Sequence, residues 1–335
     1  MLLTEGGPGI GLGHLMRCIA IAESARGTGM RPLFFVNKNT AVSQILDDRR
    51  FRFKEIRNPF IRRVPRVFGK IQDAPVLIDS KKDVSCLIGR LQKQGCTVTL
   101  LDNVTRARLA ADNVIYPMAH YIPRELSWKK AKGLVRHGER YFPLRREFSS
   151  CKPAIRKRYI LITMGGADFN NITRTVLESL EGRVGQEPIV VCIGKAFKHK
   201  AWLERYRRVE RNTIRIVREP KNFARLLSGA RLVITAFGVT IYEAAYYRVP
   251  VFVIYNYPDD QRYSRLLERL GLCETIGYYK TVRKSDIIGR VRSFLGSKRG
   301  GRRARGRKVT IDAKGCRRIL AIMSGPRRRF SQKPR

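Results

Sequence analysis

Long apolar runs are missing from this 335-residue chain, although 43% of its residues are hydrophobic. None approaches the roughly 18 consecutive apolar residues that a membrane-spanning helix needs. The short apolar start has no basic stretch before it, so we see no signal peptide. The apolar content is sufficient for packed cores, which excludes wholesale disorder. We therefore expect a globular, cytoplasmic protein.

Clusters of cysteine and histidine are missing as well. The seven cysteines are scattered and form no Cys-x-x-Cys pair, and none of the four histidines flanks them at the spacing of zinc ligands. The odd number and the wide spacing indicate reduced thiols rather than a disulfide framework. We expect no metal and no cofactor.

Acidic residues are scarce. There are 27 Asp and Glu against 69 Lys and Arg, which gives a formal net charge of +42. Such a chain attracts polyanions, so loose attraction to an anionic membrane or to nucleic acid is expected. The basic residues are dispersed and thicken only after Ser297, and no nucleic-acid-reading motif accompanies them. Specific nucleic-acid binding is therefore not favoured, and no obligatory protein partner is predicted.

Short apolar runs alternate with helical patterns along both halves of the chain. This alternation is typical of parallel sheets that are covered by helices on both faces. Helices are predicted at Thr173–Leu180 and Tyr263–Leu270. Besides a short start at Leu2 and Leu3, the predicted strands are Leu33–Val36, Pro75–Asp79, Thr97–Leu101, Asn113–Tyr116, Tyr159–Thr163, Pro188–Ile193, Leu232–Thr235 and Val251–Tyr255.

The fold class is therefore α/β, with two Rossmann-like domains facing each other across a cleft. A basic, proline-containing segment at 145–157 has no strong apolar period and serves as the predicted linker. The N-terminal domain is then 1–144 and the C-terminal domain 158–323. Residues 324–335 form a basic tail that we expect to be disordered.

A glycine-rich turn between Gly9 and Gly13 follows the first apolar residues and leads into an amphipathic segment. Glycines let backbone N–H groups approach an anion, and the helix dipole favours negative charge at this end. His14 stands where that anion would lie, and histidine is suited to proton transfer near neutral pH. The turn predicts a phosphate-type site with a general base, although such turns also occur without a function.

Two similar turns follow predicted strands in the second half. In the first, Gly165 and Gly166 allow close approach to a phosphate or a sugar. In the second, the backbone at 238–240 could bind a diphosphate, with a hydroxyl from Thr240, while Glu243 could accept hydrogen bonds from a ribose diol. Either turn alone could be structural, and Glu243 a surface charge. Three turns at the carboxyl ends of parallel strands favour a ligand site.

Three motifs occur in a fixed order: Gly-x-Gly-x-Gly-His-x-x-Arg-Cys at Gly9–Cys18, Met-Gly-Gly-x-Asp at Met164–Asp168 and Gly-x-Thr-x-x-Glu-Ala at Gly238–Ala244. Together they resemble the nucleotide-sugar hydrolase of pseudaminic acid biosynthesis and its relatives among spore-coat polysaccharide proteins. The resemblance covers essentially residues 1 to 323. It implies the two-domain glycosyltransferase-B fold, similar to the lipid II N-acetylglucosaminyltransferase.

The resemblance implies that His14 is the catalytic base, activating the water that attacks the anomeric carbon of a UDP-sugar. UDP is then expected on the second domain, with Glu243 at the ribose. Helix N-termini and basic side chains can neutralise the leaving diphosphate without a metal. Arg17, one turn after His14, either contacts phosphate or covers the helix face. The diphosphate contacts that we expect are Gly13, Arg17, Gly165, Gly166, Gly238, Val239 and Thr240.

Two positions that face the sugar in those hydrolases differ here. The hydrolases carry Asp-His-Tyr after the strand at 75–79, whereas this chain has Asp79, Ser80 and Lys81. An Asn-Gln pair is replaced by Asp260 and Gln261. We expect Asp79, Lys81, Asp260 and Gln261 to contact the sugar, with Lys81 binding a carboxylate or phosphate or remaining a solvated lysine. The changed pocket implies another sugar or an acceptor other than water.

The expected function is hydrolysis of a UDP-activated deoxy-amino sugar to UDP and free sugar, in surface-glycan biosynthesis of the nonulosonic acid type. The alternative is a glycosyltransferase that moves the sugar to a glycan or lipid acceptor, with His14 deprotonating the acceptor hydroxyl. A polyanion binder without enzymatic activity is a third hypothesis, against which the intact His14 turn argues.

Overall fold

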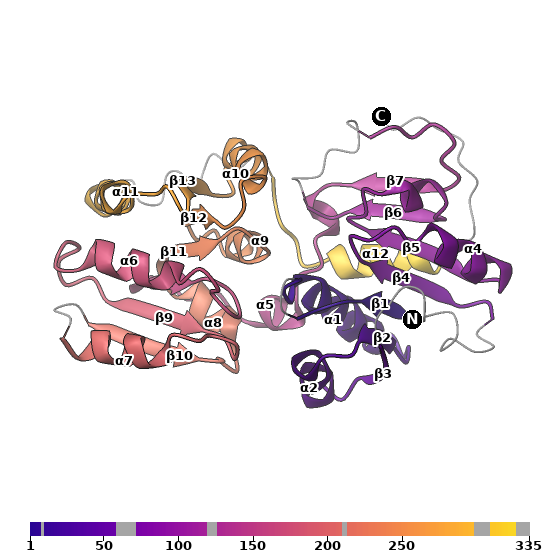
Figure 1. Ribbon diagram of the computed structural model, residues 1–335, viewed down its shortest axis with the longest axis horizontal. Coiled ribbons are helices and arrows are strands. Elements are labelled where there is room, and N and C mark those ends of the chain that lie inside the picture. Colours follow the sequence, from indigo (N-terminus) through magenta and orange to yellow (C-terminus); the bar gives the residue numbers. More distant parts are fainter. Residues whose placement is uncertain (8–9, 58–71, 119–125, 210–212, 298–308, 326–335) are drawn as a thin grey trace. The chain divides into compact units, whose positions relative to one another are not determined.

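The structure is a computed structural model that describes residues 1–7, 10–57, 72–118, 126–209, 213–297 and 309–325. Two compact units divide the chain. The first comprises Met1–Arg146 together with the segment that begins at Asp312, and the second comprises Glu147–Ile311. Each unit contains one parallel sheet flanked by helices (Figure 1). The predicted α/β class is confirmed.

The sheet of the first unit has the strand order β3-β2-β1-β4-β5-β6-β7, and every neighbouring pair is parallel. The order reverses between β1 and β4, which makes this pair the topological switch point where open α/β sheets bind ligands. The strands are β1 (Leu2–Thr4), β2 (Leu33–Asn37), β3 (Arg52–Ile56), β4 (Pro75–Asp79), β5 (Thr97–Leu101), β6 (Asn113–Tyr116) and β7 (Leu134–His137).

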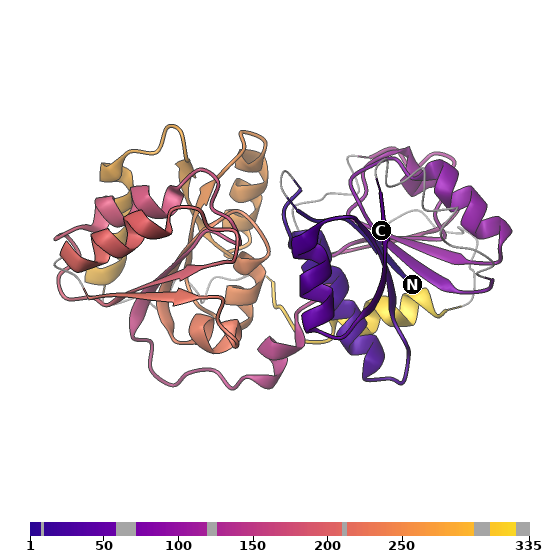
Figure 2. The ribbon, with the colours of Figure 1, turned by 60° about the horizontal axis from the view of Figure 1, so that its bottom comes forward.

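Alternate strand residues face opposite sides of this sheet, so Leu2 and Leu3 belong to two different cores. The core of Leu2 is completed by α1 (Gly13–Arg26), α2 (Thr40–Asp48) and α12 (Gly315–Met323). The core of Leu3 is completed by α4 (Ser85–Lys93) and the short helix η1 (Arg106–Leu109). Figure 2 shows α4 and the yellow α12 on opposite sides of the strands. A further short helix, η3 (Glu139–Tyr141), contacts α12.

The second sheet has the order β10-β9-β8-β11-β12-β13, again wholly parallel. Its switch point lies between β8 and β11. The strands are β8 (Tyr159–Thr163), β9 (Ile189–Ile193), β10 (Ile214–Arg218), β11 (Ala230–Ala236), β12 (Val251–Tyr255) and β13 (Glu274–Tyr278).

Helices cover the second sheet as well. One apolar core joins it to α6 (Ile172–Leu180), α7 (Lys200–Val209) and α11 (Lys284–Gly296). The helices α8 (Phe223–Ser228) and α9 (Thr240–Tyr246) contact each other and β11, and α10 (Asp260–Arg269) contacts β12 and β13. Both units are therefore Rossmann-like.

The C-terminal helix corrects the predicted domain boundary. We expected residues 158–323 to form the second domain, but α12 packs on α1 and on β4, β5 and β6 of the first unit. Its buried side chains Ile319 and Met323 complete the core of that unit. Only long-range packing decides this, because the helix is amphipathic and could cover either sheet.

The predicted linker at 145–157 contains a short helix, α5 (Arg146–Ser150). Phe148 is fully buried, and its carbonyl accepts a 2.7 Å hydrogen bond from the Tyr247 hydroxyl. This segment therefore belongs in part to the second unit. The predicted tail at 324–335, beyond its first two residues, lies outside the described residues, as do the basic run at 298–308 and Gly9.

The predicted strands are all present, and the strands that we did not predict are β3, β7, β10 and β13. These four are the edges of the two sheets. Edge strands are partly exposed and carry charged side chains that blunt further pairing, so their sequences lack the continuous apolar pattern. Arg52-Phe-Lys-Glu-Ile56 is an example, with one buried residue among five.

Gly315 provides a test of how α12 is seated. A Cβ atom at this position would lie 2.0 Å from the Phe142 carbonyl oxygen, which is backbone and cannot move aside cheaply. We expect Gly315→Ala to lower the free energy of unfolding by about 1–3 kcal/mol, measured by urea denaturation.

The matched control is Gly289→Ala inside α11, where a Cβ atom meets no neighbour. That change should stabilise by about 0.5–1 kcal/mol, because alanine favours a helix. Equal effects of the two substitutions would contradict the seating of α12.

Candidate active site

The candidate site lies at the switch point of the first sheet. Thr4 of β1 pairs with Asp79 of β4, and Asp79 pairs with Leu101 of β5. The next residues of the three strands, Glu5, Ser80 and Asp102, therefore leave the sheet at one edge. All three are buried. Polar side chains at such an edge need partners, and each of these finds them locally.

The loop after β1 directs α1 toward this edge. Gly7 has a φ of +122°, and a Cβ atom there would lie 2.7 Å from the Asn39 side chain, so only glycine fits. The helix begins at Gly13 with no side-chain cap. His14 and Arg17 are three residues apart and therefore lie on one face of α1.

His14 is held by Asp79. Its Nδ1 lies 2.6 Å from Asp79 Oδ1, and 13% of its side chain is exposed. An ionised carboxylate only accepts hydrogen bonds, so Nδ1 carries the proton in the neutral ring and Nε2 keeps its lone pair. Asp79 thus fixes the tautomer in which Nε2 can act as a base. We expected Asp79 to contact the sugar, but its side chain is fully buried and positions His14 instead.

Arg17 also differs from expectation. We expected it to contact phosphate or to cover the helix face, whereas it is buried beneath the edge of the sheet. Nε donates to Asp79 Oδ2 at 3.0 Å and Nη2 to Asp79 Oδ1 at 2.8 Å, a bidentate pair. Nη1 donates to Asp102 Oδ2. The guanidinium is therefore fully committed to two carboxylates.

Asp102 is the site residue that sequence reasoning missed. It follows β5 with a φ of +48°, a left-handed conformation that costs a non-glycine residue energy and often marks functional sites. Its Oδ1 is buried and has no hydrogen-bond partner among the described residues. The available signal was an aspartate directly after a central strand, adjacent in the sheet to Asp79.

The cluster shifts the pKa values of its members. Burial opposes ionisation of Asp79, but the charges of Arg17 and His14 outweigh it and lower the pKa of this carboxyl below its usual range. Burial raises the pKa of Asp102 to about 6, with Arg17 opposing and Asp79 adding to the shift. Burial likewise disfavours the charged Arg17, yet its two carboxylates raise the pKa of the guanidinium above its ordinary value.

A second polar group stands beside this cluster. Glu5 accepts a 3.0 Å hydrogen bond from Ser80 Oγ and pairs with Lys82 Nζ at 2.5 Å. Asn103 holds the same loop by donating to the carbonyls of Ser80 and Lys82 at 2.7 and 2.9 Å. Lys81, which we expected at the sugar, is exposed. The lysine built into this edge is Lys82.

At the switch point of the second sheet, Gly165 and Gly166 follow β8. A Cβ atom on Gly194, after β9, would lie 2.5 Å from the Gly166 carbonyl oxygen, so the two loops touch through their backbones. The N-terminus of α6 is already occupied, because Asp168 accepts hydrogen bonds at 2.9 Å from the amides of Ile172 and Thr173. This helix end is filled by a carboxylate and offers no anion site.

The loop after β11 differs from that arrangement. Gly238 and Val239 lead into α9, whose N-terminus has no side-chain cap. Thr240 begins the helix and is half-buried, while Glu243 is 3% exposed. Glu243 is thus not a surface charge. The backbone at 238–240 and the Thr240 hydroxyl lie on the carboxyl side of the switch point, as predicted from the sequence.

Asp260 and Gln261 begin α10 on the neighbouring strand's edge, after β12. Asp260 Oδ2 accepts a 3.3 Å hydrogen bond from the Tyr257 amide, and Gln261 is exposed. Asn256 in the same loop accepts a 2.8 Å hydrogen bond from Asn170, which comes from the loop after β8. The loops after β8 and β12 are therefore in contact, and their strands flank β11 in the sheet.

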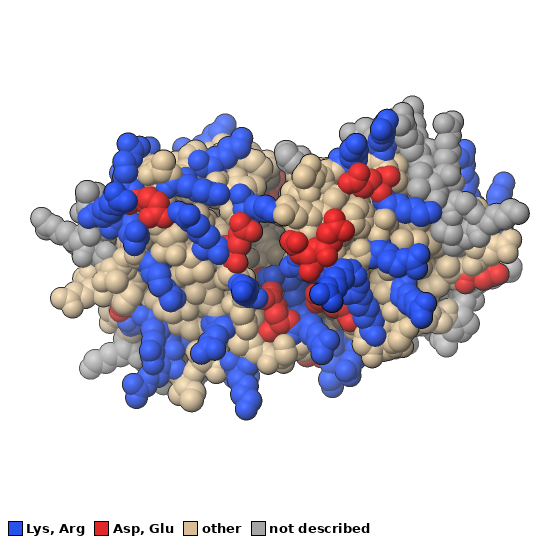
Figure 3. Space-filling model, turned by 90° about the horizontal axis from the view of Figure 1, so that it is seen from below, with Lys and Arg blue, Asp and Glu red and all other residues tan. Residues whose placement is uncertain are grey.

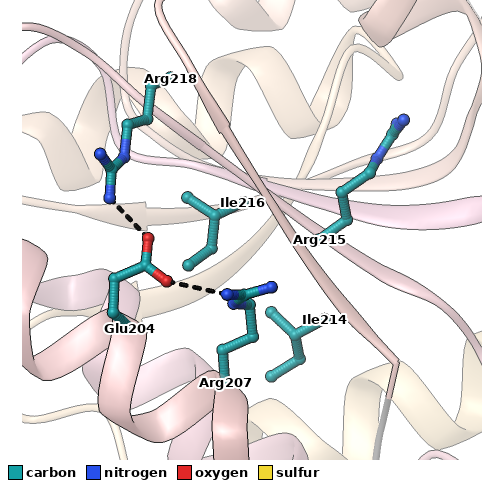
Figure 4. Close-up of a pocket in the computed structure, with 6 residues that line it drawn as sticks. All are labelled: Glu204, Arg207, Ile214, Arg215, Ile216 and Arg218. Atoms are coloured by element: carbon teal, nitrogen blue, oxygen red, sulfur yellow. Dashed lines mark hydrogen bonds and ion pairs between the residues drawn. The ribbon is translucent and has the colours of Figure 1, made fainter.

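A hollow of about 500 Å³ lies between α7 and β10 (Figure 4). Within it, Glu204 is paired with Arg207 at 3.2 Å and with Arg218 at 2.5 Å. Its lining includes none of the predicted site residues. It sits on an edge strand, away from the switch point, and its acid is already neutralised, so we do not assign it to the site.

Among the described residues, no group of three or more His, Cys, Asp and Glu side chains could hold a metal ion. None of the described helices is long and apolar enough to cross a membrane. The basic side chains on the face in Figure 3 are spread widely, with acidic groups between them. That face shows no single basic patch.

Comparison with known proteins supports the architecture. No protein-family model matches the chain. An uncharacterized protein of Methanocaldococcus jannaschii is 27% identical over 274 residues, which are 76% of this chain and 55% of that protein. The chain thus spans about half the length of this curated relative.

Three solved structures align with 96% of this chain. MurG of Acinetobacter baumannii aligns with a TM-score of 0.66, 15% identity and 98% of its own chain covered. The chain has the glycosyltransferase-B fold. S. aureus MnaA in complex with UDP aligns with a TM-score of 0.64 and 14% identity, and 94% of its own chain is covered. The UDP-GlcNAc 2-epimerase of Neisseria meningitidis, bound to UDP-GlcNAc, aligns with a TM-score of 0.61 and 12% identity, and 98% of its own chain is covered.

Asp102 makes stability depend on pH. Its pKa is about 6 in the folded state against an ordinary 3.8, so the folded state holds the proton more tightly. The stability that this group contributes is complete below pH 4 and is lost as the pH rises through 6. Two pKa units correspond to about 3 kcal/mol.

Asp102→Asn mimics the protonated carboxyl at every pH. We expect urea denaturation to give wild type and D102N similar free energies of unfolding at pH 4, with D102N more stable by about 3 kcal/mol at pH 7. Parallel pH dependences for the two proteins would contradict the raised pKa.

Proposed function

We propose that this protein hydrolyses a UDP-activated deoxy-amino sugar to UDP and free sugar, in surface-glycan biosynthesis. The observation that carries the proposal is the pairing of His14 with a buried, ionised Asp79. When this imidazole is neutral its Nε2 is unprotonated, and Arg17, itself bound by Asp102, holds the carboxylate that orients the ring. A histidine without such a pair is simply a polar residue at a turn.

In the proposed reaction, His14 Nε2 takes a proton from water while the water oxygen attacks the anomeric carbon. The bond between that carbon and the diphosphate oxygen breaks, and UDP leaves with the electron pair. Asp79 stabilises the imidazolium that forms, the same role that a carboxylate has in other histidine-based sites. The leaving diphosphate is already a stable anion, so no general acid is needed.

For the nucleotide we propose the second sheet. Gly238, Val239 and Thr240 would bind the diphosphate through backbone amides and a hydroxyl, and Glu243 the ribose diol. Support comes from the uncapped α9 and from the place of this loop at the switch point. It also comes from two proteins of the same fold that were solved with UDP or UDP-GlcNAc bound. Gly13, Gly165 and Gly166 remain proposed backbone contacts, and Lys81, Asp260 and Gln261 proposed sugar contacts.

Transfer to a glycan or lipid acceptor is the second candidate. Two apolar side chains, Ile10 and Val104, are exposed by 43% and 44% in the loops after β1 and β5, two strands of the sheet that carries the His14 site. Water needs no apolar contact, whereas a large acceptor would use one. In this reaction His14 deprotonates the acceptor hydroxyl. UDP release that rises sharply when an acceptor is added would favour transfer, and release in water alone would favour hydrolysis.

The His14 role predicts a separation of turnover from binding. His14→Ala should abolish UDP release from a UDP-sugar, because no base remains, while calorimetric titration still shows UDP affinity close to that of wild type. His137→Ala, which removes an exposed histidine at the end of β7, is the matched control and should leave both unchanged. Turnover that persists in H14A would refute the assignment.

The nucleotide site predicts a binding defect in the second unit. Thr240→Val removes one hydroxyl at nearly constant volume and should weaken UDP about tenfold in calorimetry, the usual loss for a hydrogen bond to a charged group. Thr213→Val, at an exposed position before β10, is the control. Wild-type protein should prefer UDP over CMP and GDP. Weak, unselective binding that vanishes with added salt would mean that charge alone attracts nucleotides.

A further inference from the structure

The arrangement of Arg17 creates a difficulty for His14. Arg17 Nη2 lies 3.1 Å from His14 Nδ1, because both groups bind the same oxygen of Asp79. Nδ1 donates its own proton to that oxygen, so the two nitrogens are neighbours rather than hydrogen-bond partners. A guanidinium this close disfavours a second positive charge on the ring.

Arg17 also weakens the help that Asp79 gives. The carboxylate accepts two hydrogen bonds from the guanidinium as well as the one from His14. Its negative charge is therefore shared, and less of it remains to stabilise an imidazolium. Left alone, Arg17 would turn His14 into a poor base.

Asp102 supplies the missing charge. Its carboxylate pairs with Arg17 Nη1, whereas the nitrogen next to His14 is Nη2. The buried group then contains two carboxylates and one guanidinium, a net charge of −1 that one proton on His14 neutralises. With Asp102 uncharged, the same proton would leave a buried excess of +1.

Holding Arg17 in place does not by itself explain why a charged residue is buried here. Asp102 is 3% exposed, its Oδ1 has no partner among the described residues, and its backbone is left-handed. An asparagine would offer Arg17 the same acceptor oxygen without a buried charge. We propose that Asp102 is a positioning residue that acts on His14 through Arg17, cancelling the guanidinium charge so that His14 can take up a proton.

Of the other ionisable groups beside this cluster, Glu5 and Lys82 form an ion pair with each other, and neither Cys18 nor Tyr116 carries charge in the working range. Cys18 on α1 has a thiol whose pKa burial and then Asp79 raise well above its ordinary value. Tyr116 on β6 donates its hydroxyl to the Asn103 carbonyl at 2.8 Å, and burial raises its pKa. The charge on His14 is therefore set by Asp79, Arg17 and Asp102.

The inference rests on the proposed role of His14 as a base, but its test does not require turnover. The chain has four histidines, so the ring signal of His14 in proton NMR is assigned by its loss in His14→Gln. In D102N that ring should lose its proton about one pH unit lower than in wild type. Asp83→Asn, an exposed carboxylate at the start of α4, is the matched control and should leave the signal unchanged.

Arg17→Met should shift the His14 signal in the opposite direction to D102N. Removing the guanidinium should move proton loss from His14 to higher pH. Each variant decides the matter alone if the other fails to fold. A His14 signal in D102N that follows the Asp83→Asn control, or one in R17M that moves to lower pH, overturns the inference.

Activity gives a second readout if a substrate turns over. D102N should lower kcat for UDP release about tenfold with KM unchanged, and the acidic limb of its pH profile should move with the ring signal. A fall in kcat without movement of the limb would mean a purely structural role and overturn the inference. Absence of UDP-sugar turnover in wild type would instead count against the proposed function, while the NMR result would still stand.

Discussion

The buried carboxylate of Asp79 is the constraint on which the first unit depends. It sits at the end of a central strand with no access to solvent, so its charge must be met by protein groups. Arg17 and His14 meet it from one face of α1, which fixes the rotation of that helix over the sheet. The placement of the helix, of the glycine loop before it and of the neighbouring strands therefore depends on the Asp79 carboxylate.

The same anion connects stability with chemistry. Arg17 lets Asp79 remain ionised in the interior, but its charge opposes protonation of the neighbouring imidazole. Asp102 relieves that opposition at the cost of a strained backbone and an unpartnered buried oxygen. A cluster that served the fold alone would need only one carboxylate for one guanidinium. The second carboxylate lowers stability locally, as residues at functional sites often do.

The two sheets share a topology but use their edges differently. In the first, side chains fill the switch point: His14, Arg17, Asp79 and Asp102. In the second, the switch point is bordered by backbone, with glycines after β8, β9 and β11, and one helix end there is already capped by Asp168. A backbone-lined loop suits an anionic ligand, and a side-chain cluster suits proton transfer. This division fits the proposed roles of the two units.

The sequence by itself determined the central strands, the α/β class and the place of the glycine turn before His14, because buried strands and glycine turns have local patterns. It did not reveal the edge strands β3, β7, β10 and β13, whose partial exposure erases that pattern. Only tertiary structure decided that α12 returns to the first unit, that Arg17 is buried and that Asp102 joins the site. Those outcomes depend on which strands become neighbours, and strand order is set by packing over the whole unit rather than by any short segment.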